Sequence, residues 1–153
     1  MEVVVLLHNV RSAHNVGSIF RTADAAGVQH MYLSGYTPLP RDRFGRIQKE
    51  IAKTALGAER FIPWEHHVST TKLISMLKKR GWHIVGVEQD ARARNYRSFR
   101  QKRPTVFIFG NEVRGLPKSV RAHCNELLEI PMRGRKESLN VSVAAGIILF
   151  SIR

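Results

Sequence analysis

Short apolar runs alternate along the chain with segments whose apolar residues recur at helical spacing. The runs are rich in Val, Ile and Leu and predict buried strands at residues 3–7, 31–33, 83–87, 105–109 and 127–130. A further short strand is predicted at residues 61–62. Helical spacing and helix-end signals predict helices at residues 16–26, 47–56, 71–80, 117–123 and from 141 onwards. This alternation predicts an α/β domain with a mainly parallel sheet and helices on both faces.

The last segment, residues 141–152, is apolar on nearly every side, so we predict a helix that is buried all round. Such a helix must dock against the rest of the domain, a second copy of the chain, or both. Ser138 and Asn140 precede it. They can cap the helix start, or they can belong to a site where backbone N–H groups face a ligand.

The length of 153 residues is most simply one domain, spanning residues 1–153. Cys124 is the single cysteine, so neither a disulfide framework nor a cysteine-based zinc site is expected within one chain. The apolar run at the start is too short for a signal peptide, and residues 141–152 fall short of a bilayer span. We therefore expect a soluble, cytoplasmic protein that has no membrane partner.

The charge is strongly positive, with 25 Lys and Arg against 12 Asp and Glu and a net charge of +13. Such a surface attracts polyanions, with nucleic acid ahead of a membrane surface. The basic residues form three patches: Arg92, Arg94, Arg97, Arg100, Lys102 and Arg103; Arg41, Arg43, Arg46, Lys49 and Lys53; and Arg133, Arg135 and Lys136. Tyr96 and Phe99 interleave with the first patch. Phosphate contacts with aromatic stacking would suit single-stranded or looped RNA.

Ligands of parallel sheets collect where loops leave the carboxyl ends of strands, here after residues 7, 109 and 130. In the loop at residues 110–117, Leu116 and Pro117 stand where a phosphate-binding loop needs Lys and Ser or Thr. No G-x-G-x-x-G follows a strand either, so common nucleotide sites are excluded. Gly110 would let the backbone approach a flat ligand closely. Glu112 is either a site residue or a solvated acid in a turn.

The first loop and helix contain Arg11 and Arg21, with Asn15 as the predicted N-cap and Gly27 just after the helix. Arg21 lies beside the apolar face, where an arginine either extends to solvent or pairs with a specific group. The seven histidines include only adjacent pairs, which rarely chelate one metal, so no metal site is expected.

Taken together, three ordered motifs resemble those of the SpoU-type RNA ribose 2′-O-methyltransferases of the SPOUT superfamily. They are Asn15-x-Gly17 with Arg21-Thr-Ala, then Gly110-Asn-Glu-x-x-Gly-Leu116, then Ile130-Pro-Met with Ser138-Leu-Asn-Val-Ser-Val-Ala-Ala145. The resemblance covers nearly the whole chain and is to minimal members with one catalytic domain. It implies a C-terminal deep trefoil knot, which is a rare exception to the usual connection rules. It also implies a homodimer whose active site is shared between subunits.

The resemblance further implies S-adenosylmethionine as the cofactor and a tRNA or rRNA ribose 2′-hydroxyl as the methyl acceptor. The positions that match the family's cofactor site are Val87, Gly110, Ile130, Met132, Ser138 and Leu139. The positions that match its catalytic site are Arg21, Asn15, Glu112, Ser138 and Asn140, with Arg21 supplied by the second subunit. The expected RNA-binding residues are Arg11, Arg41, Arg43, Arg92, Arg94, Arg97, Arg114, Arg133 and Arg135.

Methyl transfer from a sulfonium requires in-line approach and removal of the hydroxyl proton, with no covalent enzyme intermediate. Taking a proton from a guanidinium at pH 7 costs about 7 kcal/mol, so two roles stay open for Arg21. It can act as the base, or it can stay charged and bind phosphate while Glu112 or water takes the proton.

Two other functions are compatible with the sequence. One is a non-catalytic RNA-binding protein on the same scaffold, and the other is methylation of a base. The sequence distinguishes neither tRNA from rRNA nor the nucleotide that is modified. The basic loop at residues 132–137 and the short last helix depart from many relatives and can affect substrate choice and dimer strength.

Overall fold

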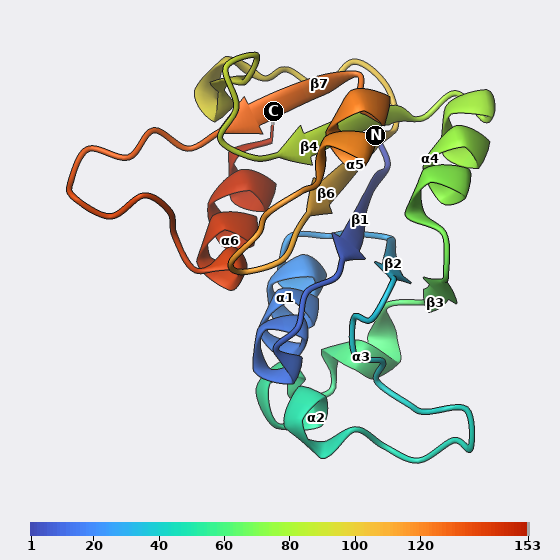
Figure 1. Cartoon of the computed structure of the whole chain (residues 1–153). Coiled ribbons are helices and arrows are strands. Elements are labelled where there is room, and N and C mark those ends of the chain that lie inside the picture. Colours follow the sequence, from blue (N-terminus) through green and yellow to red (C-terminus); the bar gives the residue numbers. More distant parts are fainter. Residues whose placement is uncertain (153) are drawn as a thin grey trace.

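The computed structural model describes residues 1–152 and contains seven strands, six α-helices and one 3-10 helix (Figure 1). The strands are β1 (Val3–His8), β2 (His30–Ser34), β3 (Trp64–His67), β4 (His83–Val87), β5 (Arg94–Asn95), β6 (Thr105–Phe109) and β7 (Glu126–Glu129). The helices are α1 (Ala13–Ala25), α2 (Lys49–Ala55), α3 (Ala58–Phe61), α4 (Thr70–Lys79), η1 (Tyr96–Ser98), α5 (Lys118–His123) and α6 (Val141–Ser151).

The strands form one sheet in the order β3-β2-β1-β6-β4-β7-β5, and all six pairings are parallel. β1 and β6 lie in the centre, with Val5 opposite Phe107. The parallel sheet predicted from the sequence is therefore confirmed. Because every strand points the same way, the loops after β4, β6 and β7 emerge at one edge of the sheet, where parallel sheets bind ligands.

Alternate residues of the central strands face two separate cores. On one face, Val5 and Phe107 pack in the core that α1, α2, α3 and α6 cover. On the other face, Leu6 and Val106 pack in the core covered by α4 and α5. Side chains of a strand point alternately to opposite faces, so a strand that is apolar at every position is buried on both sides. The predicted helices on both faces are confirmed.

Three local predictions are wrong. Residues 61–62 are not a strand: Gly57 takes a φ of 95° and begins the short helix α3, so the strand moves beyond Pro63 to β3. Ser12 caps α1 in place of Asn15, whose backbone N–H donates to the Ser12 hydroxyl. Asn140 alone caps α6, since its side chain accepts from the Ser142 N–H while Ser138 does not cap.

The terminal helix α6 is not buried all round within one chain. Ala145, Ile148 and Leu149 are buried against α1 and the sheet, whereas Val143 is 49% exposed and Phe150 is 65% exposed. One apolar side of α6 is therefore exposed on the surface of the chain.

Candidate active site

A pocket lies at the carboxyl ends of β4, β6 and β7, where their three loops meet the start of α6. Its lining residues are Val87, Glu88, Gln89, Phe109, Gly110, Asn111, Glu112, Val113, Arg114, Gly115, Glu129, Ile130, Met132, Ser138, Leu139, Val141 and Ala144. Three of the lining residues are acidic and one is basic, which contrasts with the net charge of the chain. The pocket therefore suits a ligand that carries positive charge and apolar surface.

The loop at residues 110–116 forms one wall of the pocket. It is closed by a backbone hydrogen bond from Gly115 N–H to the Asn111 carbonyl (2.9 Å). A side chain at Gly110 would meet the backbone of Gly115 at 2.7 Å, and Gly115 itself has a φ of 64° and touches Glu88. Both glycines are therefore required for the backbone to fold this closely against the end of β4.

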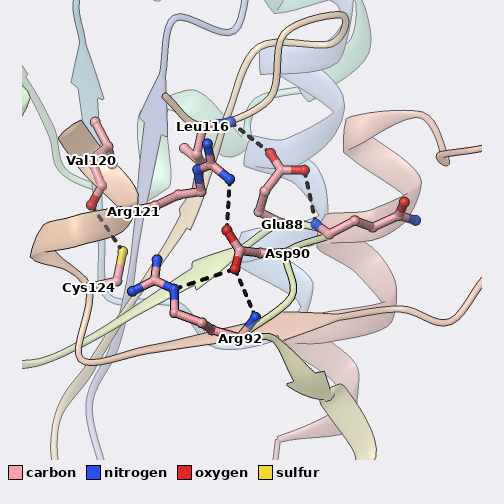
Figure 2. A network of polar contacts seen from close by, with 8 residues as sticks. Glu88, Asp90, Arg92, Leu116, Val120, Arg121 and Cys124 are labelled. Atoms are coloured by element: carbon pink, nitrogen blue, oxygen red, sulfur yellow. Dashed lines mark hydrogen bonds and ion pairs between the residues drawn. The ribbon is translucent and has the colours of Figure 1, made fainter. Parts of the chain in front are cut away.

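Glu88 fixes that loop to β4, as Figure 2 shows. Its carboxylate accepts from the backbone N–H of Leu116 (2.7 Å) and of Gln89 (2.9 Å). Next to it, Asp90 accepts from Arg121 of α5 (2.7 Å) and from the Arg92 backbone (2.8 Å). These two acids hold together the loops that follow β4 and β6, so internal contacts of the chain set the shape of the pocket.

Glu112 connects the pocket to the start of α1. Its carboxylate accepts from the backbone N–H groups of Arg11 (2.9 Å) and Ser12 (2.8 Å) and from the side chain of Asn15 (3.1 Å). Burial alone would raise the pKa of Glu112. The hydrogen bonds from Arg11, Ser12, its own N–H and Asn15 outweigh burial and hold the pKa below its ordinary value. A carboxylate with a low pKa and occupied oxygens is a weak proton acceptor.

The polar network continues from Glu112 to α6. The Asn140 side-chain amide donates to the Asn15 side-chain oxygen (3.3 Å), and Asn15 in turn donates to Glu112. Three of the predicted catalytic residues, from separate motifs, thus lie in one chain of hydrogen bonds. Ser138 lines the neighbouring pocket.

All six residues predicted for cofactor binding line the pocket: Val87, Gly110, Ile130, Met132, Ser138 and Leu139. Arg21 does not line the pocket of its own chain. It is exposed on α1 and lines a different hollow, together with Lys53 of α2 and Phe150 of α6. Of the predicted catalytic residues, Glu112 and Ser138 line the pocket, Asn15 and Asn140 connect to it through Glu112, and Arg21 lies apart.

Comparison with known proteins supplies the family. The family model described as SpoU rRNA Methylase family matches residues 2–150. The chain belongs to the SpoU rRNA methylase family.

Similar members of the SpoU family include the 23S rRNA (guanosine-2′-O-)-methyltransferase RlmB of Pseudomonas aeruginosa, at 36% identity over 150 residues. Another is a putative TrmH family tRNA/rRNA methyltransferase of Staphylococcus haemolyticus, at 33% identity. The matches cover 98% and 99% of this chain but 58% of each relative. The chain therefore spans a little over half the length of these relatives.

Solved structures of other proteins share the fold of this chain. An AdoMet-bound rRNA methyltransferase from Sinorhizobium meliloti superposes with a TM-score of 0.89 at 34% identity, covering 98% of this chain and 55% of that one. A structure described as giving insights into the 2-OH methylation of C/U34 on tRNA has a TM-score of 0.79 at 27% identity, with 97% of this chain and 92% of that chain covered. The α/β fold of the family is thus confirmed for this chain.

Some basic residues of this SpoU-family chain form ion pairs with carboxylates of the same chain. Of the nine residues predicted to bind RNA, Arg94 donates to Glu126 (3.1 Å), and Arg92 lies 3.4 Å from Asp90. The prediction that Phe99 stacks on RNA is wrong, because Phe99 is 6% exposed and packs edge-on against Phe107 with ring centroids 5.5 Å apart. Tyr96 is also partly buried against the same core.

The sequence-based predictions omitted several pocket residues, of which Glu88, Gln89, Asn111 and Glu129 are polar. Glu88 directly follows β4, and Glu129 ends β7. Their position at the carboxyl ends of strands is the signal that points to them. Neither residue belongs to a glycine-rich loop or to one of the three motifs, so those patterns do not include them.

Among residues 1–152, no group of three or more His, Cys, Asp and Glu side chains is placed to hold a metal ion. Within the same residues, none of the helices has the length and apolar character that crossing a membrane requires.

Proposed function

We propose that this protein transfers a methyl group from S-adenosylmethionine to a ribose 2′-hydroxyl of tRNA or rRNA. The observation that carries the proposal is the pocket at the ends of β4, β6 and β7, because the six residues expected to hold the cofactor line it together. Membership of the SpoU family and the printed names of the relatives support the same activity.

The pocket residues fit the chemistry of this cofactor. Val87, Ile130 and Leu139 offer apolar contacts to an adenosine, and Gly110 lets the ring approach the backbone. Glu88 and Glu129 offset the positive charge of a sulfonium compound. When bound, the cofactor supplies an electrophilic methyl group. The remaining catalytic task of the chain is to orient the acceptor hydroxyl and lower the cost of its deprotonation.

Glu112 is assigned a positioning role rather than that of a base. Its lowered pKa and its three hydrogen bonds leave little tendency to accept a proton. It holds the start of α1 and Asn15 against the pocket. We therefore assign the hydroxyl proton to water, with the charged Arg21 stabilising the developing alkoxide and the adjacent phosphate.

Arg21 is proposed to act in the pocket of a second copy of the chain. It lies outside the pocket of its own subunit, beside the exposed Phe150 of α6. Pairing two copies through the open side of α6 would cover Val143 and Phe150 and bring α1 of one chain toward the other. The homodimer with a shared active site rests on this arrangement.

The domain boundaries, knot, location and RNA contacts are part of the same proposal. We propose that residues 1–153 form a single domain and that it acts in the cytoplasm. We propose that the segment joining β7 to α6 is threaded as a deep trefoil knot, as the family resemblance implies. Tracing this segment in a crystal structure would test the proposal. The nine arginines predicted to bind RNA contact its phosphates, with Arg133 and Arg135 in the loop beside the pocket.

Two measurements test the activity. Calorimetry should detect S-adenosylmethionine binding to the intact chain, and nucleoside analysis of treated RNA should detect a 2′-O-methylated ribose. Gly110→Ala should abolish cofactor binding, because a Cβ would meet the Gly115 backbone. Gly134→Ala is the matched control, since nothing lies within 4 Å of its Cβ position. Absence of cofactor binding would leave only an RNA-binding scaffold, and a methylated base would reassign the acceptor.

Mixing inactive variants tests whether Arg21 acts in the pocket of its own chain or in that of a second copy. Arg21→Ala and Gly110→Ala proteins should each be inactive alone. Their mixture should regain part of the activity, because one of the two sites of a mixed dimer then has both intact groups. No recovery after the subunits have exchanged would refute the shared site.

A further inference from the structure

The loop between β2 and α2 contains a small rigid hairpin, residues 41–47, here called the 41–47 finger. The loop extends from the body of the molecule (Figure 1). Arg41 and Ile47 form an antiparallel bridge, and the Asp42 N–H donates to the Arg46 carbonyl (3.0 Å). Gly45 takes a φ of 77° and donates to the Asp42 carbonyl (2.9 Å), which closes the turn. The finger therefore has a defined shape although all its residues are exposed.

The side chain of Asp42 stabilises the turn of the 41–47 finger through hydrogen bonds. Its carboxylate accepts from the backbone N–H groups of Phe44 and Arg46, both at 2.9 Å, and from the Arg46 side chain at 2.7 Å. Arg41 donates to the Gly45 carbonyl (2.9 Å). These bonds order the tip without using the aromatic side chain, so Phe44 is not needed for the shape of the turn.

Phe44 stands at the tip and is 68% exposed. The guanidinium groups of Arg43 and Arg46 lie 4.9 Å and 5.1 Å from its ring centroid. Arg46 is anchored to Asp42, whereas Arg43 forms no ion pair with any residue from 1 to 152. An exposed aromatic ring bordered by cations matches the needs of a nucleotide, which offers a flat base and a negative phosphate.

We propose that Phe44 is a stacking platform for an unpaired base of the RNA substrate, and that Arg41 and Arg43 bind the phosphates beside that base. This inference rests on the proposed function, because it takes RNA as the substrate. The base lies on the Phe44 ring while Arg43, which has no carboxylate partner within residues 1–152, moves from the ring to a phosphate. Arg46 stays in place through Asp42 and borders the stack.

Helix α2, which follows the 41–47 finger in the chain, lies beside Arg21. Lys49 and Lys53 follow the finger on α2, and Lys53 lines the same hollow as Arg21 of α1. Residues 41–53 contain five Lys and Arg and two acids, of which Asp42 is paired with Arg46 (2.7 Å) and Glu50 forms a hydrogen bond with His14 (3.0 Å). Positive charge therefore continues from the tip to the arginine proposed for catalysis, as an RNA strand leading to the active site requires.

The test compares Phe44→Ala with the intact chain on two RNAs, a stem–loop with unpaired bases and a duplex with the same number of phosphates. Loss of one stacked base should weaken stem–loop binding about tenfold. Duplex binding should not change, and Phe44→Trp should bind the stem–loop at least as well as the intact chain. A fluorescent 2-aminopurine in the loop should be quenched by the intact chain and less by Phe44→Ala.

Phe61→Ala is the matched control, because Phe61 is 70% exposed on α3 and forms no cation–π contact within residues 1–152. Equal losses for Phe44→Ala and Phe61→Ala, or equal losses on both RNAs, would overturn the inference. The inference would also be overturned if Phe44→Ala bound anionic lipid vesicles more weakly than the intact chain but bound the stem–loop equally well. Calorimetry with S-adenosylmethionine keeps the two proposals apart, because Phe44 lies outside the pocket lining and its variant should bind cofactor normally.

Discussion

At the scale of single residues, the pocket depends on acids that are used as structural acceptors. Glu88 binds two backbone N–H groups, and Glu112 binds two more and the Asn15 amide. A carboxylate can accept several hydrogen bonds, and N–H groups left without a partner are costly. These acids therefore set the geometry of the loops on which the proposed chemistry takes place.

Glu112→Gln should lower the free energy of unfolding by about 1–2 kcal/mol at pH 7, because an amide nitrogen replaces one of two accepting oxygens. The pKa of Glu112 is lowered in the folded state, so its contribution is fully present above the ordinary pKa of 4.5 and is lost as the pH falls from there through the lowered pKa. Urea unfolding should show the intact chain and the variant converging in acid. Glu2→Gln, at an exposed position, should match the intact chain throughout.

Cys124 should react slowly in the folded protein. Burial raises the pKa of its thiol to about 11, so the thiolate, which is the reactive form, is scarce at pH 8. Alkylation by iodoacetamide should be about 100-fold slower than in the urea-unfolded chain, where the ordinary thiol pKa of 9.0 applies. Mass spectrometry of timed samples measures both rates, and equal rates would show that the site opens readily.

At the scale of elements, the first motif is explained in part by helix packing. Gly17 lies where α1 crosses α2, and a Cβ there would meet the Thr54 hydroxyl and the Ile51 carbonyl. Close helix approach keeps Arg21 and Lys53 beside each other on the surface. The Asn15-x-Gly17 pattern thus joins a polar residue of the site to a glycine required for packing.

Gly17→Ala should destabilise the protein by about 1–3 kcal/mol, because the Ile51 backbone cannot move aside. Gly146→Ala on α6 is the comparison, since the nearest atom to its Cβ position is a Thr22 methyl at 3.7 Å. Alanine is favoured over glycine inside a helix, so that variant should gain about 0.5–1 kcal/mol. Thermal unfolding of the three proteins checks both signs, and a destabilised Gly146→Ala would contradict the packing described.

At the scale of the whole molecule, charge and apolar surface are distributed unevenly. The chain carries +13, yet its pocket is lined by Glu88, Glu112 and Glu129 with only one arginine. The outer side of α6 leaves Val143 and Phe150 exposed, and Phe150 lines the same hollow as Arg21. This arrangement suits a cationic cofactor inside, an anionic substrate outside, and a second subunit on α6.

Phe150→Lys should convert the proposed dimer into a monomer, because it adds a charge to an apolar interface beside Arg21 and Lys53. Light scattering should then report half the mass, with unchanged circular dichroism. Methyl transfer should be lost, since Arg21 no longer reaches a second pocket. Val68→Lys, at a position 85% exposed, should stay dimeric. A monomeric intact chain would refute the shared site.

The amino-acid sequence predicted the parallel sheet, its central strands and most of the motif residues that line the pocket. Strands of a parallel sheet are buried on both faces, so β1, β4 and β6 are recognisable as continuous apolar runs. Loops after such strands meet at one edge of the sheet whatever their details. Residues at those strand ends, such as Val87, Gly110 and Ile130, are therefore predictable as pocket residues from their positions and motifs.

Which side chains are available for function depends on how distant segments of the chain pack together. Phe99 and Tyr96 lie among exposed arginines in the sequence. In the structure, Phe99 is buried in the core and Tyr96 packs partly buried against it. Phe44 lies in a similar basic run and remains exposed. The hydrogen bonds of Glu112 span about a hundred residues, and the hollow of Arg21 joins three helices. The local sequence indicates how strongly a residue prefers burial. Which other residues its side chain contacts depends on how distant segments pack.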